Sequence, residues 1–419
     1  MNILYAAIDQ EVPGTKGGSV HVAAVAEGLA ALGHQVTALV TPGAGQPRPS
    51  AVRWIPMPPP FGSTHLRLAR SGAIATLARG VRPDAIIERY HNFGGEAIRL
   101  APGLGAVGML EVNAPVIDHP GSTKARLDRA LVVQPMRRWR ERLCRIADVI
   151  VTPNASILPP GLPPDRIKVL EWGADTERFH PGAAGAAPPV PPPAPTVAIF
   201  SGAFRSWHGA INLVDAIKIL RSRDRRDIGA IFAGDGPELP RVKAAAAGID
   251  TIVFTGAIPH DRMPAMLASA HIGVAPFDLA AHAPLSLGFY WSPLKIFEYM
   301  ATGLPVVAPA VDRIPSLVAD GREGVLYEIP PEGGSYIAGG SYIAGGSYIA
   351  SGSHDASGSY IASHADALAD ALVRLGDPVL RARLGTAARE RAVRDYSWSA
   401  HCRALEAALA DARERRTGR

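Results

Sequence analysis

The feature that most constrains the fold is a succession of strand, glycine-rich turn, helix and strand that occurs twice along the chain. Its first copy has an apolar strand at 2–8, a helix at 20–32 and a second strand at 35–40. In the helical segment, apolar side chains recur at the spacing of one helix face. A strand–helix–strand unit joins parallel strands, so this pattern predicts an α/β fold.

The alternation continues through the rest of the chain and starts again after a proline-rich stretch. We expect further strands and helices in the first half at 85–88, 108–112, 126–145 (a long helix) and 148–152. In the second half we expect strands at 196–201, 229–233, 251–255, 271–276 and 305–308, with helices at 210–221 and 295–301. Two Rossmann-like parallel-sheet domains explain this repetition most economically.

Composition places the domain boundaries. The segment 181–195 reads PGAAGAAPPVPPPAP, which favours a linker over helix or sheet. We therefore expect an N-terminal domain at 1–180 and a C-terminal domain at 196–395. The last segment, 396–419, is expected to be a helix that packs back on the N-terminal domain.

A low-complexity tract interrupts the second domain. Residues 333–362 form five units of six residues, most of them reading GGSYIA or SGSYIA. A β-helix also has a hexapeptide period, but it needs more coils than this. We interpret the tract as an expanded surface loop.

Composition also excludes several classes of protein. The net charge of +5 suits an anionic ligand or an anionic membrane surface, and we expect no nucleic-acid partner. Two cysteines, Cys144 and Cys402, cannot form a disulfide framework, which favours a reducing compartment. No signal peptide and no long apolar span is recognisable, so we expect a cytoplasmic protein.

Two glycine turns precede the first helix of each half. Gly17 and Gly18 lie where free helix amides can attract an anion, although a tight turn needs glycine in any case. In the second half, the segment GAFRSWHG (202–209) places Arg205 and His208 beside a helix start. Arg205 could hold a diphosphate through two parallel hydrogen bonds, or could simply be solvated.

Two further motifs follow in the second half. Gly234 and Gly236 flank Asp235, which suits a helix cap as well as a ligand contact. In the segment from Ser292, Lys295 lies in the first turn of a helix that Ser292 can cap, and its charge opposes the helix dipole there. A bound diphosphate explains that placement, and Glu298 on the same face could accept two ribose hydroxyls. The alternative is a surface Lys–Glu pair.

Together these segments resemble the family-4 glycosyltransferases of the GT-B fold. The matching stretches are GGSVHVAAVAEGLAALGHQV, GAFRSWHG, AGDGP, FTGAIPHDRMPAMLASAHIGVAPF and SPLKIFEYMATGLPVVAP, in the order typical of the family. The resemblance covers nearly the whole chain apart from 333–362. It implies two Rossmann-like domains facing a central cleft, and transfer of a sugar from a UDP- or GDP-sugar with retention of anomeric configuration.

The resemblance also assigns roles to individual residues. Gly18 would lie near the transferred sugar, Arg205 and Lys295 would bind the diphosphate, and Glu298 would bind the ribose. Ile258 to His260 would border the nucleobase. The full set of donor-side candidates adds Gly17, His208, Gly234, Gly236, Ser292 and Leu294.

The chain departs from the family pattern at three places. Tyr290 stands where the family often has a glutamate, and His208 stands where many members have a lysine. The strand at 108–112, which often ends in a catalytic histidine, is followed here by Asn113, which we include among the catalytic candidates. Glu111 and His119 are our acceptor-side candidates.

No Asp-x-Asp sequence occurs, so we expect no required metal or other cofactor. Helix N-termini, Arg205 and Lys295 could stabilise the leaving diphosphate instead. The expected role is glycosyl transfer in polysaccharide, glycolipid or glycoconjugate biosynthesis, with a saccharide, lipid-linked or small-molecule acceptor. A nucleotide-sugar epimerase of the same fold and a non-catalytic sugar-nucleotide-binding protein remain the alternatives.

The segment 136–146 has two interpretations. Its apolar residues Met136, Trp139, Leu143 and Ile146 recur at near-helical spacing, with arginines between them. This pattern is typical of a basic amphipathic helix that lies peripherally on the inner face of a membrane. It also fits a helix whose apolar stripe packs under the N-terminal sheet.

Overall fold

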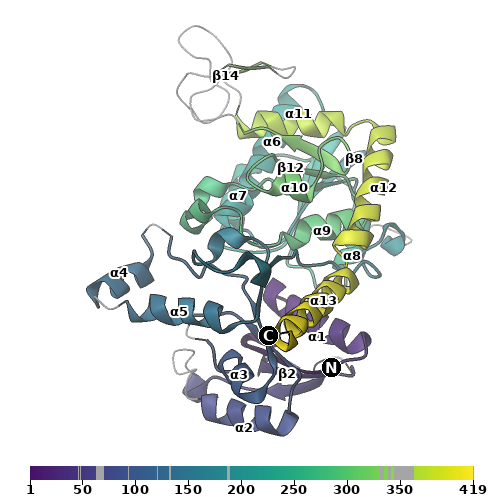
Figure 1. Cartoon of the computed structure of the whole chain (residues 1–419). Coiled ribbons are helices and arrows are strands. Elements are labelled where there is room, and N and C mark those ends of the chain that lie inside the picture. The colour runs from purple at the N-terminus through teal and green to yellow at the C-terminus, as the bar shows by residue number, and fades with distance from the viewer. Residues whose placement is uncertain are drawn as a thin grey trace. The chain divides into compact units, whose positions relative to one another are not determined.

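The computed structural model divides the chain into two compact α/β units (Figure 1). The N-terminal unit comprises Met1–Gly173, Ala283–Leu294 and Asp395–Arg419, and the C-terminal unit comprises Ala174–His282 and Lys295–Arg394. The structure describes residues 1–45, 47, 49–62, 70–92, 94–119, 121–131, 134–185, 189–329, 335–337, 341–343 and 363–418.

The first crossing between the units comes at Gly173, earlier than the boundary at 180 that the proline-rich segment predicts. The reason is local packing. Phe179 is 1% exposed, and its carbonyl accepts a hydrogen bond from Arg389 of the C-terminal unit at 2.7 Å.

The N-terminal unit contains a seven-stranded sheet in the order β3-β2-β1-β4-β5-β6-β7. Every neighbouring pair is parallel, so the predicted parallel sheet is confirmed. Its strands are β1 (Asn2–Val12), β2 (Gln35–Pro42), β3 (Arg53–Pro56), β4 (Ala85–Arg89), β5 (Val107–Glu111), β6 (Val149–Thr152) and β7 (Ile167–Val169).

Helices cover both faces of this sheet. On one face, α1 (Gly17–Ala31) contributes Val22, Val25 and Leu29 to an apolar cluster with β1 and β2. On the other face, a second cluster includes Ile74 and Ala78 of α2 (Ser71–Val81). The remaining helices before the first crossing are α3 (Ala101–Leu104), α4 (Thr123–Ala130) and α5 (Pro135–Ile146).

The last helix, α13 (Trp398–Thr417), packs on α1 within the N-terminal unit (Figure 1). Cys402, Leu405 and Leu409 belong to the same apolar cluster as the buried face of α1. The two helices approach closely because a Cβ atom on Gly28 would lie only 2.5 Å from Sγ of Cys402.

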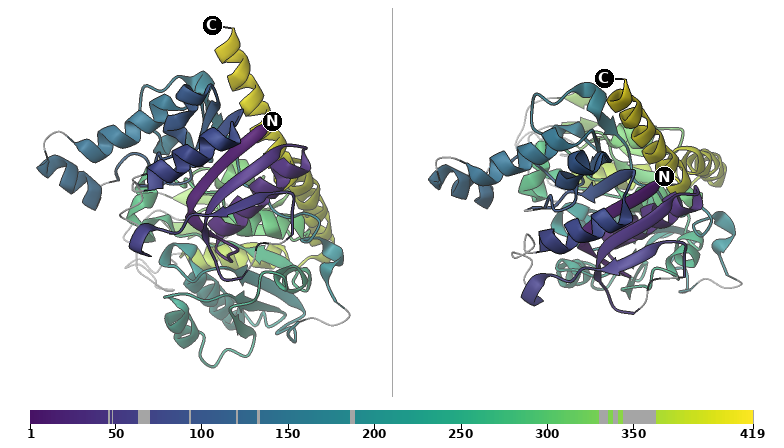
Figure 2. Two further views of the ribbon diagram at one scale, coloured as in Figure 1. Left: turned by 90° about the horizontal axis from the view of Figure 1, so that it is seen from below. Right: turned by 60° about the horizontal axis from the view of Figure 1, so that its bottom comes forward.

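The long helix expected at 126–145 is wrong, because two helices, α4 and α5, occupy that stretch. They form a hairpin that extends away from the sheet (Figure 2). Gln134 has the left-handed φ of 47°, and Pro135 occupies the first turn of α5. Proline lacks an amide hydrogen and disfavours helical backbone before it, so the chain cannot continue one helix through this point.

The C-terminal unit contains a six-stranded parallel sheet in the order β10-β9-β8-β11-β12-β13. Its strands are β8 (Thr196–Ser201), β9 (Ile228–Ala233), β10 (Ile252–Gly256), β11 (Ile272–Val274), β12 (Val306–Pro309) and β13 (Gly324–Tyr327). Its helices are α6 (Ala210–Ser222), α7 (Leu239–Ala245), α8 (Met263–Ala268), α9 (Leu294–Ala301), α10 (Ile314–Leu317), α11 (His364–Arg374) and α12 (Pro378–Asp395). In both sheets the first strand of the unit is central, which is the Rossmann arrangement.

The repeat tract contains two short strands, β14 (Ser335–Ile337) and β15 (Ser341–Ile343), which pair antiparallel. The rest of the tract lies outside the described residues. No helix within the described part of the chain is long and apolar enough to cross a membrane.

Candidate functional site

Lys295 occupies an unusual environment in the C-terminal unit. It lies in the first turn of α9, and its ammonium nitrogen is 4.1 Å from the ring centre of Phe200 and 5.5 Å from that of Phe277. Among the described residues this nitrogen has no hydrogen-bond partner. Burial lowers the pKa of Lys295 from 10.5 to about 7, although Glu298 raises it in part. A buried cation without an acceptor can bind an anion strongly once one arrives.

Glycines bring the turns at the ends of β8 and β9 together next to this lysine. Gly202 has φ 125°, and a Cβ atom there would lie 3.4 Å from Nζ of Lys295. Gly234 has φ 139°, and its Cβ would lie 1.9 Å from the carbonyl oxygen of Gly202. Gly236 has φ 157° and similarly close backbone contacts. The two turns therefore pack backbone against backbone, which explains these glycines without any ligand.

The turn after β8 also holds Arg205 and His208. Arg205 is exposed, and its guanidinium carbon lies 5.9 Å from the ring centre of Trp207. Nδ1 of His208 is hydrogen-bonded to the carbonyl of Ala203. Burial, together with the charge of Lys295, lowers the pKa of His208 to about 3, so this side chain is neutral at physiological pH. His208 thus cannot supply the charge of the lysine that many family members have here.

Glu298 lies one turn beyond Lys295 on α9, and its side chain is 15% exposed. Its Oε1 is 3.6 Å from Nε2 of His260, which follows β10 in the loop that begins near Ile258. The ring of His260 also packs edge-on against Phe179 at 5.6 Å. The alternative of a surface Lys–Glu pair is wrong, because Lys295 is buried and its ammonium makes no hydrogen bond to Glu298.

The expectation that Ser292 caps α9 is also wrong. Its hydroxyl donates to Glu171 at 2.7 Å and accepts from the amide of Trp172 at 2.9 Å. These partners lie in the N-terminal unit, to which Ser292 and Leu294 belong. A cap requires the hydroxyl oxygen to face the free amides of its own helix, and here that oxygen is already occupied.

In the N-terminal unit, α1 begins at Gly17 without a side-chain cap. A Cβ atom on Gly17 would lie 3.2 Å from Leu294, and one on Gly18 would lie 2.1 Å from Oε1 of Gln10. Gly18 is therefore required by the close approach of Gln10. The start of α1 keeps uncapped amides that could accept an anionic group.

Glu111 ends β5 and is 2% exposed. It accepts hydrogen bonds from the hydroxyl of Tyr5 at 2.9 Å and from Nε2 of His21 on α1. Burial raises the pKa of Glu111, but His21 and Arg89 lower it further, to about 2. Glu111 is therefore an ionised carboxylate whose two oxygens are both engaged.

His401 of α13 completes a buried group with His21 and Glu111, whose ligand atoms lie within 4.8 Å of one another. Such a set could in principle hold a metal ion. However, His21 and Glu111 are already in direct hydrogen-bond contact, and two ligands of one zinc ion are separated by roughly 3 Å or more. Nδ1 of His401 is bonded to the carbonyl of Glu171 at 2.7 Å. The group is thus better described as a hydrogen-bond network that links α1, β5 and α13.

Asn113 follows β5 and is fixed by Trp172. The indole nitrogen donates to its side-chain oxygen at 2.8 Å, and its amide nitrogen has no partner among the described residues. Trp172 also stacks on His21 with ring centres 4.2 Å apart. Asn113 consequently retains one unused donor in a rigid setting.

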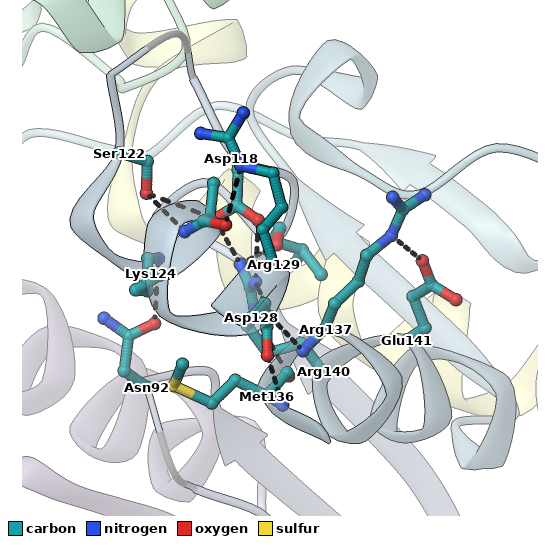
Figure 3. Close-up of polar contacts among 12 residues, drawn as sticks. Asn92, Asp118, Ser122, Lys124, Asp128, Arg129, Met136, Arg137, Arg140 and Glu141 are labelled. Atoms are coloured by element: carbon teal, nitrogen blue, oxygen red, sulfur yellow. Dashed lines mark hydrogen bonds and ion pairs between the residues drawn. The ribbon is translucent and has the colours of Figure 1, made fainter. Parts of the chain in front are cut away.

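His119 lies apart from these residues, beside the α4–α5 hairpin. It lines a cavity of about 440 Å³ whose other lining residues are Asp118, Gly121, Ala125, Asp128, Arg129, Gln134 and Arg137. Arg140 of α5 is 3% exposed and binds both oxygens of Asp118, at 3.0 and 3.1 Å (Figure 3). Asp128 accepts from two amides at the start of α5. Both acidic residues of the cavity are therefore already paired.

The apolar stripe of α5 packs within the N-terminal unit. Leu143 is 1% exposed, and the indole nitrogen of Trp139 donates to the carbonyl of Gly94 at 2.9 Å. The interpretation in which this stripe enters a membrane is therefore wrong, because the stripe is already covered. The exposed arginines of the helix are Arg137, Arg138, Arg142 and Arg145.

Comparison with known proteins agrees with the sequence motifs. Residues 15–178 match the sequence profile described as Glycosyltransferase Family 4, and residues 195–333 match the profile described as Glycosyl transferases group 1. The chain is a family-4 glycosyltransferase. It is accordingly an enzyme, which removes the non-catalytic alternative.

Individual relatives are similar over most of this transferase. The α-maltose-1-phosphate synthase of Mycobacterium tuberculosis is 25% identical, covering 85% of this chain and 86% of that protein. The sucrose-phosphate synthase of Thermosynechococcus elongatus superposes with a TM-score of 0.67 at 18% identity over 97% of each chain. Anabaena HepE, solved in complex with UDP-glucose, gives a TM-score of 0.61 at 15% identity over 97% of this chain and 99% of that one. The GT-B architecture of two Rossmann-like domains is thereby confirmed.

The transferase has buried polar groups that the sequence interpretation missed. Asp9, Arg89 and Trp172 surround the start of α1 without belonging to any motif considered above. One signal was available, because a charged residue at the end of an otherwise apolar strand is costly to bury without a purpose.

Proposed function

We propose that this transferase takes its sugar from a UDP-sugar, retains the anomeric configuration and requires no metal ion. The observation that carries the proposal is the buried ammonium of Lys295, which lacks a polar partner and faces the Gly202 turn. A nucleoside diphosphate supplies the negative charge that this site lacks. The complex of HepE with UDP-glucose supports uridine as the base.

The chemistry is transfer of a glycosyl group between two oxygens. The bond from the anomeric carbon to the β-phosphate oxygen breaks, and its electron pair leaves with UDP. A bond from an acceptor oxygen to the same carbon forms, and the proton of that oxygen is released. Fixed positive charge beside the diphosphate lowers the barrier, and Lys295 and Arg205 are assigned this role.

The remaining donor contacts follow from the same placement. Glu298 accepts the ribose hydroxyls, and His260 and Ile258 border the base. Gly234 and Gly236 shape the neighbouring turn, while His208 offers only a neutral nitrogen.

The acceptor side is assigned to the N-terminal unit, with Asn113 as the catalytic-side group and Glu111 and His119 as acceptor-side residues. Saccharides, lipid-linked sugars and small hydroxylated metabolites all fit transfer to oxygen. A role in polysaccharide, glycolipid or glycoconjugate biosynthesis follows from these acceptor classes.

Nucleotide binding tests the proposal directly. We expect UDP to raise the melting temperature more than GDP or ADP does, with and without EDTA, because a ligand that binds only the native state stabilises it. Arg205→Ala and Lys295→Ala should each reduce the shift. Equal shifts for all three nucleotides would contradict the choice of base, and loss of the UDP effect in EDTA would contradict metal independence. The anomeric configuration of the product, read from proton couplings in NMR, tests retention.

We also propose that the enzyme is cytoplasmic and that the α4–α5 hairpin gives weak electrostatic contact with an anionic membrane. Arg138 and Arg142 on α5 are exposed, and so are Leu127 and Leu131 on α4, at 51% and 54%. Such binding should weaken as salt is raised. Co-sedimentation with anionic and neutral liposomes at two salt concentrations is the test, and equal binding to both would contradict it.

A further inference from the structure

Asp9 and Arg89 form a buried polar pair whose hydrogen-bonding capacity is largely unused. Arg89 is 8% exposed, and its Nε and Nη1 atoms have no hydrogen-bond partner among the described residues. Oδ1 of Asp9 is likewise buried and unpartnered there. Nε of Arg89 and Oδ2 of Asp9 are 3.6 Å apart, which is an ion pair but too long for a hydrogen bond.

A buried arrangement of this kind destabilises a protein unless something satisfies it. Native structures pair nearly all buried polar atoms, so an exception calls for an explanation such as a ligand or water. For comparison, Arg70 in the same unit is 6% exposed, and its Nη1 donates to the carbonyl of Met57 at 2.6 Å. Arg70 therefore holds the fold together through a backbone contact, whereas Arg89 makes no such hydrogen bond through Nε or Nη1.

The pair lies where ligands of Rossmann-like sheets bind. Asp9 is near the carboxyl end of β1 and Arg89 ends β4, and these strands are parallel neighbours. Nη2 of Arg89 is 3.5 Å from the position that a Cβ atom on Gly18 would take, at the start of α1. The guanidinium carbon is 5.5 Å from the ring centre of Trp172. The carboxyl edge of such a sheet is the usual position of a binding crevice.

The charges of the pair indicate the chemistry of its ligand. Asp9 and Arg89 neutralise each other, and the neighbouring Glu111 is ionised and saturated by Tyr5 and His21. An added anion would meet a locally negative group of side chains. A neutral hydroxyl can instead donate to a carboxylate and accept from a guanidinium at the same time, and two adjacent hydroxyls can use both side chains.

We propose that Asp9 and Arg89 bind adjacent hydroxyl groups of the acceptor, which is therefore a neutral polyol at this position, such as a sugar or cyclitol ring. This inference rests on the proposed function, because it assigns the acceptor to the N-terminal unit. The unused amide donor of Asn113, held by Trp172, lies in the same part of the unit.

The test uses the double variant Asp9→Asn/Arg89→Met, which removes both charges while keeping similar size. The probes are myo-inositol and methyl α-D-glucoside, with binding to the full chain followed by saturation-transfer NMR. We expect the wild-type protein to bind at least one probe and the double variant to bind it about 10- to 100-fold more weakly, because hydrogen bonds to charged groups are lost. The melting temperature of the double variant should be unchanged or higher, since apolar replacement of a buried pair is often neutral or stabilising.

Arg70→Met is the matched control. Its melting temperature should fall while probe binding stays the same, because a backbone hydrogen bond is lost far from the pair. The proposal is overturned if neither probe binds the wild-type protein, if the double variant binds as well as wild type, or if it loses binding only together with its thermal stability. UDP binding, measured on the same samples by calorimetry, reports separately on the donor site. Loss of UDP binding in the wild-type protein would refute the proposed function, whatever the probes do.

Discussion

The depressed pKa of Lys295 makes a measurable connection between proton binding, stability and the donor. The perturbation is Lys295→Met, which keeps the length of the side chain and removes its charge. In the folded protein, burial lowers the pKa of Lys295 from 10.5 to about 7. The unfolded chain therefore binds this proton below pH 10.5, whereas the folded chain binds it only below about pH 7.

The sign of the effect follows from this difference. Between about pH 7 and pH 10.5 the unfolded state holds more protons, so Lys295 makes the free energy of unfolding increase with pH. Below about pH 7 both states are protonated, and the cost of burying the charge is at its maximum. A pKa difference of about 3.5 corresponds to at most about 5 kcal/mol, since one pKa unit is worth about 1.4 kcal/mol.

We therefore expect Lys295→Met to melt at a higher temperature than wild type at pH 6.5, with the difference shrinking steadily towards pH 9.5. Lys218→Met is the matched control, because Lys218 lies on α6 with a side chain that is 46% exposed and paired with Asp215. It should show no such trend. A difference that is constant with pH, or that grows as pH rises, would refute the reasoning.

The donor should reverse this depression. A bound diphosphate next to Nζ restores the charged form, so UDP binding at pH 8 should take up about 0.9 proton per site. Calorimetric titration in buffers of different ionisation enthalpy measures this number. Lys295→Met should bind UDP weakly and take up almost none. Equal proton uptake by the two proteins would show that Lys295 does not meet the diphosphate.

Three further outcomes are expected. Glu298→Ala should weaken UDP binding by roughly 10-fold or more but change the binding of 2′,3′-dideoxy-UDP little, because only ribose hydroxyls are lost; calorimetry with both nucleotides checks this. Deleting 333–362 should leave melting temperature and UDP binding nearly unchanged, because loop length costs little free energy; a large loss of either would show the tract to be structural. Gly234→Ala should lower the melting temperature strongly, because its Cβ would lie 1.9 Å from a backbone oxygen at a φ of 139°; a melting curve like that of wild type would contradict the close packing of the two turns.

Much of the fold was predictable because its parallel strands are buried on both faces. The strand at 196–201 is buried at every position and so appears in the sequence as a continuous apolar run. The edge strands β3 and β7 escaped prediction because they are short and only partly buried. The break at Gln134 was missed because the arginine-rich pattern continues on both sides of Pro135.

The candidate site was only partly predictable for a different reason. The environment of Lys295 follows largely from its place in a helix turn, which local sequence specifies. Ser292 was misassigned because its partners, Glu171 and Trp172, are distant in sequence and only the folded chain brings them near. The pair of Asp9 and Arg89 depends in the same way on the pairing of β1 with β4, which periodicity alone does not reveal.

The two units differ in the charge that they leave unsatisfied, and this difference separates their ligands. In the C-terminal unit the unpartnered group is a cation, Lys295, which lies against aromatic rings and calls for an anion. In the N-terminal unit the unpartnered atoms belong to a neutral pair, and the nearby carboxylate of Glu111 opposes a second anion. A diphosphate is therefore favoured by one unit and disfavoured by the other. A polyol, which carries no charge, gains from the second arrangement because its hydroxyls satisfy Asp9 and Arg89 at once.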